Sequence, residues 1–152
     1  MTFKNEDNGH NVLNEIFGYS SFRPGQLEII EAILTKRNVM VVMPTGAGKS
    51  LCYQVPAIYS KQKTIIISPL VALIDDQVTA LSQLGVKVSK LHSGMSRDEN
   101  VDQWRQFASG ASNILYMSPE RLMQPRMLDA LQRQSIGIFV VDEAHCISKW
   151  GA

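Results

Sequence analysis

The sequence predicts an α/β fold in which a parallel sheet carries helices on both faces. Two observations support this. Short, almost wholly apolar runs alternate along the chain with longer segments whose apolar residues recur at helical spacing. Strands without polar alternation are buried on both faces, as parallel strands are in α/β proteins. With 152 residues, 45% of them hydrophobic and 19% charged, the chain has the size and composition of about one globular domain.

The local patterns place each element in order. Residues 1–10 are polar and expected to be flexible, and the apolar spacing then predicts helices at 12–17 and 25–37, with Pro24 placed to start the second. The predicted strands are 38–43, 63–67, 86–91, 113–117 and 136–141. The helices predicted between them are 49–59, 71–83, 96–108 and 119–133, the last broken near Pro125.

Bulk properties exclude several classes of protein. The formal net charge is +1, so any surface that binds nucleic acid must be local. The cysteines, Cys52 and Cys146, match no metal-binding spacing and indicate a reducing compartment. The N-terminus lacks the pattern of a signal peptide, and no apolar run approaches the roughly 20 residues that span a bilayer. We therefore expect a soluble, cytoplasmic chain without a membrane partner.

The segment "MPTGAGKS" (43–50) has the composition of a phosphate-binding loop. Its glycines let backbone N–H groups converge on phosphate oxygens at the start of a helix, Lys49 can reach the β- and γ-phosphates, and the Ser50 hydroxyl suits Mg²⁺. Met43 stands where the general motif has its first glycine. A glycine-rich turn with an exposed lysine is the alternative, but the position between an apolar strand and a helix favours a nucleotide site. Its predicted members are Thr45, Gly46, Ala47, Gly48, Lys49 and Ser50.

A second polar segment, "DEAH", follows the last apolar strand. Asp142 is placed to hold Mg²⁺, and Glu143 to orient and deprotonate the attacking water. Such a pair could also cap a helix, but a phosphate loop in the same sheet favours catalysis. His145 has no second ligand at metal spacing, so we expect it to hydrogen-bond across the nucleotide cleft.

Three segments carry a family resemblance: "FGYSSFRPGQLEII" (17–30), "PTGAGKSLCYQVPA" (44–57) and "DEAHCISKWG" (142–151). From about residue 12 to 151 the chain resembles the RecQ family of superfamily 2 DEAH-box helicases. The resemblance implies a RecA-like P-loop NTPase domain at 38–152, truncated after the DEAH box, and adenine-recognition helices at 11–37. It further implies an ATP- and Mg²⁺-dependent 3′-to-5′ helicase that unwinds duplex DNA in recombination and repair, in the cytoplasm near the nucleoid.

The resemblance also implies roles for single residues. Gln26 would read adenine through two hydrogen bonds, while Arg23 and Tyr19 would stack on the base. Without the resemblance, Gln26 is an exposed helix glutamine and Tyr19 a core aromatic. The expected DNA contacts are Ser68, Gln77, Ser93, Ser118 and Arg121 at the phosphate backbone, and Trp150 by base stacking.

Several alternatives stay open at this point. Ser93 and Ser118 are equally suited to cap the helices after them, and Arg121 to form a structural ion pair. Trp104 is interpreted as a packing residue.

The resemblance implies a second RecA-like domain whose arginine stabilises the transferring phosphoryl group, and we expect the 152 residues to lack it. The isolated chain is then a non-catalytic nucleotide- or single-stranded-DNA-binding fragment. An RNA helicase of the DEAD/DEAH groups is the third possibility, against which "FRPGQ", "CYQVPA" and "CISKWG" argue.

Overall fold

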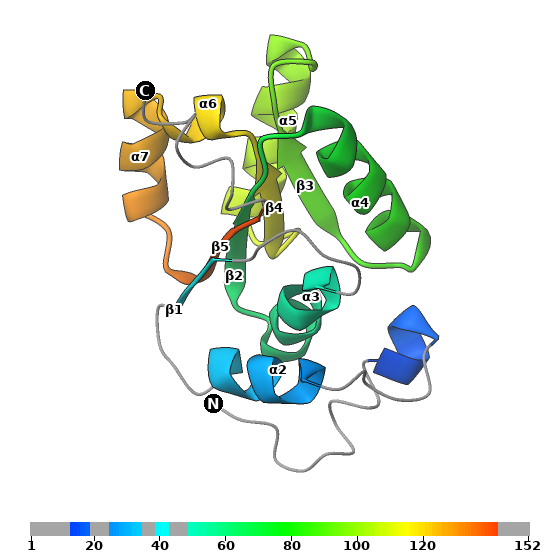
Figure 1. The fold of residues 1–152 in the computed structure, drawn as a ribbon. Coiled ribbons are helices and arrows are strands. Elements are labelled where there is room, and N and C mark those ends of the chain that lie inside the picture. The colour runs from blue at the N-terminus through cyan, green and yellow to red at the C-terminus, as the bar shows by residue number, and fades with distance from the viewer. Residues whose placement is uncertain (1–12, 19–24, 35–38, 43–48, 143–152) are drawn as a thin grey trace.

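The computed structural model describes residues 13–18, 25–34, 39–42 and 49–142. These residues form a five-stranded parallel sheet with helices on both faces (Figure 1). The strands lie in the order β1-β5-β2-β4-β3. Their bounds are β1 (Val39–Val42), β2 (Lys63–Ile67), β3 (Val88–Leu91), β4 (Ile114–Met117) and β5 (Ile136–Val141). The α/β prediction and all five predicted strands are confirmed.

The helices also follow the sequence pattern, with one difference: residues 13–17 form a π-helical turn. The predicted break near Pro125 is confirmed, because a new helix begins at that residue. Proline has no N–H and clashes with the preceding turn, so it suits the first position of a new helix. The bounds are η1 (Leu13–Phe17), α2 (Gln26–Leu34), α3 (Lys49–Ser60), α4 (Val71–Gln83), α5 (Arg97–Ala108), α6 (Pro119–Leu122) and α7 (Pro125–Gln132).

Alternate residues of the central strands pack into two cores, one on each face of the sheet. On β2, Ile66 faces α3 and α4, while Ile65 and Ile67 face the side that α5 and α7 cover. On β4, Tyr116 joins the first core and Leu115 the second. A third cluster fixes α2 on the outside of α3. Among the described helices, none has the length and hydropathy to cross a membrane.

Candidate functional site

The five strands end in register along one edge of the sheet. Val42 of β1 pairs with Val141 of β5, and Val141 also pairs with Ile67 of β2. Ile67 pairs in turn with Met117 of β4, and Met117 with Leu91 of β3. The residues that follow the strands therefore emerge in a single row. In open parallel sheets, ligands bind beyond this carboxyl edge.

Backbone hydrogen bonds extend the sheet by one residue into that row. The N–H groups that follow three strands donate to neighbouring strand ends, from Asp142 to Ile67 (2.8 Å), from Ser68 to Met117 (3.1 Å) and from Ser118 to Leu91 (3.2 Å). Parallel pairing thus brings segments that are far apart in the sequence to one edge, where three of the predicted site residues follow neighbouring strands.

At the end of β5, the Asp142 carboxylate is 7% exposed and receives a hydrogen bond from the hydroxyl of Tyr53 at 2.7 Å. Tyr53 lies on α3 and is fully buried, and its hydroxyl oxygen is also 3.1 Å from Oε1 of Gln77 on α4. Burial, the neighbouring Tyr116 phenol and the Asp142 carboxylate raise the pKa of Tyr53 well above its ordinary value. The phenol therefore stays protonated and remains a donor.

A second buried tyrosine continues this polar cluster on β4. The Gln54 amide, one residue further along α3, donates from Nε2 to the Tyr116 hydroxyl at 2.9 Å. Burial raises the pKa of Tyr116 as well, which keeps this phenol neutral. Consecutive residues of α3 are thus hydrogen-bonded to the end of β5 and to β4.

The N-terminus of α3 lies where the sequence places the phosphate loop. This helix begins at Lys49, so the last two residues of the predicted loop form its start, and Ser50 is half-buried in its first turn. Its 12 residues make a full helix, whose first N–H groups and partial positive charge favour an anion. The end of the helix therefore has the chemistry that a nucleotide phosphate requires.

The donor set also fits Mg²⁺. The Asp142 carboxylate and the Ser50 hydroxyl are hard oxygen ligands, and Mg²⁺ is usually held by one or two such groups together with phosphates and water. Within the described ranges, no cluster of three or more His, Cys, Asp or Glu side chains forms a protein-only metal site. The oxygen ligands thus suit a metal that is bound together with nucleotide phosphates.

Gln26, the first residue of α2, is 7% exposed. The alternative that it is an exposed helix glutamine is therefore wrong, whereas adenine recognition stays a prediction. The other predicted members of the nucleotide and stacking sites lie outside the described residues: Tyr19, Arg23, Thr45, Gly46, Ala47, Gly48, Glu143, His145 and Trp150.

The predicted DNA contacts after β2 differ in exposure. Ser68 is 1% exposed, and its Oγ accepts a hydrogen bond from the N–H of Leu70 at 3.4 Å. Gln77, two turns into α4, is half-buried and meets Tyr53. A phosphate contact by Ser68 stays a prediction. The Ser68 hydroxyl is already hydrogen-bonded within the turn that leads into α4.

After β3, the structure corrects one alternative. Ser93 is exposed and does not cap α5; Ser96 does, accepting from the N–H of Glu99 at 3.1 Å while the Glu99 carboxylate accepts from the N–H of Ser96 at 3.0 Å. This is a capping box, whose S-x-x-E signature is readable in the sequence. Nδ2 of Asn100 donates hydrogen bonds to the carbonyls of His92, Met95 and Ser96. These bonds stabilise the turn that contains Ser93.

After β4, Ser118 does cap α6, accepting from the N–H of Arg121 at 3.4 Å. Arg121 forms no ion pair with any carboxylate of the described residues, and its buried Nε has no hydrogen-bond partner there. The structural ion pair is therefore not supported within the described chain. Contact with DNA stays the prediction for this guanidinium.

Two features of this region were not predicted from the sequence: Tyr53, and a polar cluster of Asp75, Lys90 and His92 at the end of β3. His92 is buried and its Nε2 lies 2.8 Å from Oδ1 of Asp75, which also accepts from Nζ of Lys90 at 2.7 Å. The hydrogen bond from Lys90, together with that from His92, holds the pKa of Asp75 below its usual value. By contrast, Trp104 packs beside Phe107, with ring centroids 5.8 Å apart, as predicted.

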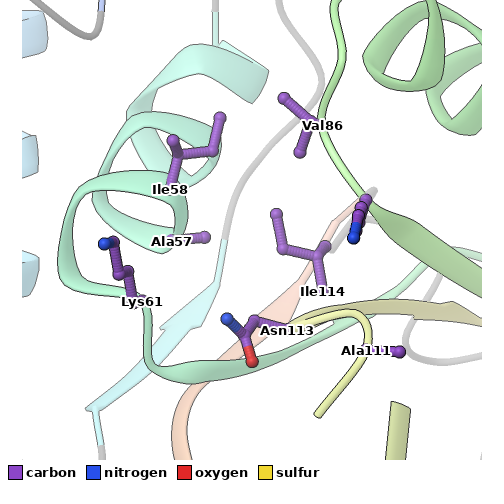
Figure 2. Close-up of a pocket in the computed structure, with 8 residues that line it drawn as sticks. Ala57, Ile58, Lys61, Val86, Ala111, Asn113 and Ile114 are labelled. Atoms are coloured by element: carbon purple, nitrogen blue, oxygen red, sulfur yellow. The ribbon is translucent and has the colours of Figure 1, made fainter. Parts of the chain in front are cut away.

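A cavity of about 170 Å³ lies at the opposite edge of the sheet (Figure 2). It lies between the end of α3 and the segments that lead into β3 and β4, where Asn113 directly precedes β4. Its lining residues are Ala57, Ile58, Lys61, Val86, Lys87, Ala111, Asn113 and Ile114. Because the strands are parallel, their amino ends are remote from the row of site residues, and this cavity is separate from the candidate nucleotide site.

The model of the DEAD/DEAH box helicase family matches residues 23–152 of this chain. The chain belongs to this family. The match includes the described phosphate-loop helix and the acidic strand end, and it extends over the predicted motif residues on either side.

Within the helicases, the chain is homologous to RecQ proteins. It is 41% identical to the ATP-dependent DNA helicase RecQ of Pasteurella multocida over 92% of this chain and 22% of that protein. The RecQ of Bacillus subtilis is 41% identical over 92% and 24% of the two chains, and the DNA helicase Q-like 5 of Arabidopsis thaliana 41% identical over 98% and 16%. The chain thus spans about a quarter or less of the length of these relatives.

Solved helicase structures share the fold. A hypothetical ATP-dependent RNA helicase from Sulfolobus tokodaii matches with a TM-score of 0.71 at 23% identity, over 97% of this chain and 44% of that one. The helicase MrfA, in a complex with DNA and AMPPNP, matches with a TM-score of 0.67 at 20% identity, over 93% and 21%. These likenesses confirm the predicted RecA-like architecture of this helicase-family chain.

Proposed function

We propose that this chain is the N-terminal ATP-binding part of a RecQ-like, ATP-dependent 3′-to-5′ DNA helicase that unwinds duplex DNA in recombination and repair. The observation that carries the proposal is the row of strand ends. It brings the buried Asp142 and the DNA-motif residue Ser68 to one edge, with the phosphate-loop helix after the neighbouring strand β1. The identity to RecQ proteins over nearly the whole chain supports DNA as the substrate.

In this proposal the start of α3 binds the triphosphate. Lys49 contacts the β- and γ-phosphates, and Ser50 and Asp142 hold Mg²⁺, which neutralises charge on the phosphates when it is bound. Glu143 follows the described strand end directly and takes the proton of the attacking water. Asp142 enters this role already oriented, because the Tyr53 hydroxyl binds its Oδ2.

Base recognition and DNA binding use the neighbouring segments. Gln26, with Arg23 and Tyr19, recognises adenine. Single-stranded DNA lies along the carboxyl edge of the sheet. There Ser93 is exposed and Gln77 and Arg121 are half-buried, whereas Ser68 and Ser118 are buried in the row that follows the strands. The proposed contacts are Ser68, Gln77, Ser93, Ser118, Arg121 and Trp150, with His145 linking this surface to the nucleotide.

We further propose that hydrolysis requires an arginine from a second RecA-like domain. RecA-like ATPase sites of this class form between two domains, and an arginine finger contributes about 10³–10⁵ in rate in related NTPases. The chain spans only 22% to 24% of the bacterial RecQ relatives compared above. The second candidate function is that of an isolated chain which binds Mg²⁺–nucleotide and single-stranded DNA with little turnover.

ATP hydrolysis tests this proposal. The purified chain is assayed with and without single-stranded DNA, beside Lys49→Ala and Glu143→Gln. Turnover at background in all samples, with nucleotide binding that Lys49→Ala abolishes, supports a binding part of a longer helicase. DNA-stimulated turnover that both variants abolish would show that the chain completes a site by itself, contradicting the requirement for a second domain. Absence of nucleotide binding would contradict the whole proposal.

A further inference from the structure

One buried hydroxyl joins three segments of the candidate site. The Tyr53 side chain is fully buried, and its oxygen lies 2.7 Å from Oδ2 of Asp142 and 3.1 Å from Oε1 of Gln77. Tyr53 belongs to the phosphate-loop helix α3, Asp142 follows β5, and Gln77 belongs to α4. The same atom therefore contacts the proposed metal carboxylate and a helix that carries a proposed DNA contact.

The hydrogens of this network can be assigned. A phenol carries one hydrogen, and neither a carboxylate nor an amide oxygen donates. The shorter contact takes the hydrogen, so Tyr53 donates to Asp142. A half-turn of the Gln77 amide about its last bond exchanges its oxygen and nitrogen and lets Nε2 donate to the phenol oxygen. The network is then directed from Gln77 through Tyr53 to Asp142.

We propose that Tyr53 is a positioning residue: it holds the Asp142 carboxylate in the orientation that Mg²⁺–nucleotide uses and transmits the position of α4 to that carboxylate through Gln77. The inference rests on the proposed function, because that function places Mg²⁺ at Asp142. It concerns a residue that touches neither metal nor nucleotide and that acts through Asp142.

Packing explains why the coupling passes through the hydroxyl. The Tyr53 ring belongs to the close-packed core formed by α3, α4 and the central strands, and such interiors resist ring displacement. A shift of Gln77 is therefore not absorbed by the ring. The shift instead changes the hydrogen bond between Gln77 and the phenol oxygen, and thereby the hydrogen bond from Tyr53 to Asp142.

The test measures how Mg²⁺ supports nucleotide binding. The intact chain is titrated with Mg²⁺ in the presence of N-methylanthraniloyl-ATP, and the affinity for the same nucleotide is measured in EDTA. We expect Tyr53→Phe to raise the half-saturating Mg²⁺ concentration by about tenfold, the lower end of the effect of removing a partner of a metal ligand. The affinity in EDTA is expected to stay within about twofold of wild type.

A matched control separates positioning from general destabilisation. Ser89→Ala also removes a buried hydrogen bond between two hydroxyls, those of Ser89 and Ser112 at 2.6 Å, but on β3 at the far edge of the sheet from β5. It is expected to lower the stability of the chain and leave the half-saturating Mg²⁺ concentration unchanged. An equal shift in Ser89→Ala and Tyr53→Phe would overturn the inference.

Gln77→Met tests whether the position of α4 is transmitted to Asp142 through Tyr53. We expect it to raise the half-saturating Mg²⁺ concentration about threefold in the wild-type background and to add nothing to Tyr53→Phe, because both substitutions break the same chain of hydrogen bonds. Additive effects would overturn transmission through Tyr53. If wild type binds the nucleotide in a Mg²⁺-dependent way and Tyr53→Phe behaves identically, this inference alone fails; if wild type shows no such binding, the proposed function fails with it.

Discussion

Asp75 ties α4 to the end of β3, and its substitution tests this connection. Its Oδ1 lies 2.7 Å from Nζ of Lys90 and 2.8 Å from Nε2 of His92. The N–H of Gly94 donates to Nδ1 of His92 at 3.0 Å. Since Nδ1 accepts, the hydrogen of the neutral imidazole is on Nε2 and is donated to the carboxylate. The buried ring thus depends on Asp75 for its acceptor.

The structure sets the expected magnitude. The Lys90–Asp75 pair has side-chain exposures of 29% and 43%, and exposed pairs contribute about 0.2–1 kcal/mol. We expect Asp75→Asn, which keeps one acceptor oxygen, to lower the free energy of unfolding by about 1 kcal/mol. Asp75→Ala also leaves the buried N–H of His92 without its acceptor, which adds about 1–2 kcal/mol. For a chain of this length, 1 kcal/mol corresponds to about 2–4 °C in Tm.

The stabilisation by Asp75 depends on pH with a definite sign. The pKa of Asp75 is lowered in the folded chain, chiefly by the Lys90 hydrogen bond. Its value in the unfolded chain is about 3.9. The carboxylate therefore contributes its full stabilisation above that unfolded value and loses it as the pH falls through the lower folded pKa. The difference between wild type and Asp75→Asn should persist from about pH 7 to pH 5 and narrow below about pH 4.

Urea unfolding followed by circular dichroism measures these differences, with Asp129→Asn as the control. Asp129 is exposed on α7 and forms no ion pair with the described residues, so its substitution should change stability by less than about 0.5 kcal/mol. The role of Asp75 is contradicted if Asp75→Asn is as stable as wild type, if Asp75→Asn and Asp75→Ala lose the same stability, or if the difference is as large near pH 3.5 as at pH 7.

Three further predictions concern local structure and are read by thermal unfolding. Ser96→Ala should cost about 1 kcal/mol by removing the capping box, whereas Ser93→Ala should leave stability unchanged; equal effects would contradict the assignment. Gly85→Ala should cost about 1 kcal/mol, because Gly85 ends α4 at φ +86° with open space around its Cα. Phe107→Ala should cost about 3–5 kcal/mol, since its ring is fully buried. Leu128→Ala, at an exposed position of α7, should cost under about 1 kcal/mol. Similar losses for the two variants would contradict the position of Phe107 in the core beneath α5 and α7.

The strands were predictable because their signal is local. A run such as "TIII" in β2 is apolar at consecutive positions, and both of its faces are buried in the structure. The start of β3 was predicted too early, at residue 86, for a physical reason. Val86 completes the end of α4, where its N–H donates to the carbonyl of Leu81 at 3.0 Å and that of Gly85 to Ser82. An apolar residue in a helix C-terminal motif is not distinguishable from the first residue of a strand by its pattern.

The start of α3 at Lys49 and the position of Asp142 after β5 were predictable because each belongs to a motif that is contiguous in sequence. The link between Tyr53 and Asp142 was not, because 89 residues separate the two. Helical spacing marks Tyr53 only as a buried position of α3. Its partner is determined by the insertion of β5 between β1 and β2, which no local pattern specifies. Contacts of this kind become visible only when the strand order is known.

The strand order also gives α3 contacts beyond those proposed for its first turn. Ser50 and Tyr53 are three positions apart, so they are neighbours on one face of the helix. Tyr53 binds the residue after β5, and Gln54 binds Tyr116 on β4. The helix whose first turn is proposed to hold the nucleotide is therefore hydrogen-bonded through its second turn to the carboxylate proposed to hold Mg²⁺. Hydrogen bonds from Tyr53 thus connect this helix to the Asp142 carboxylate and to Gln77 of α4.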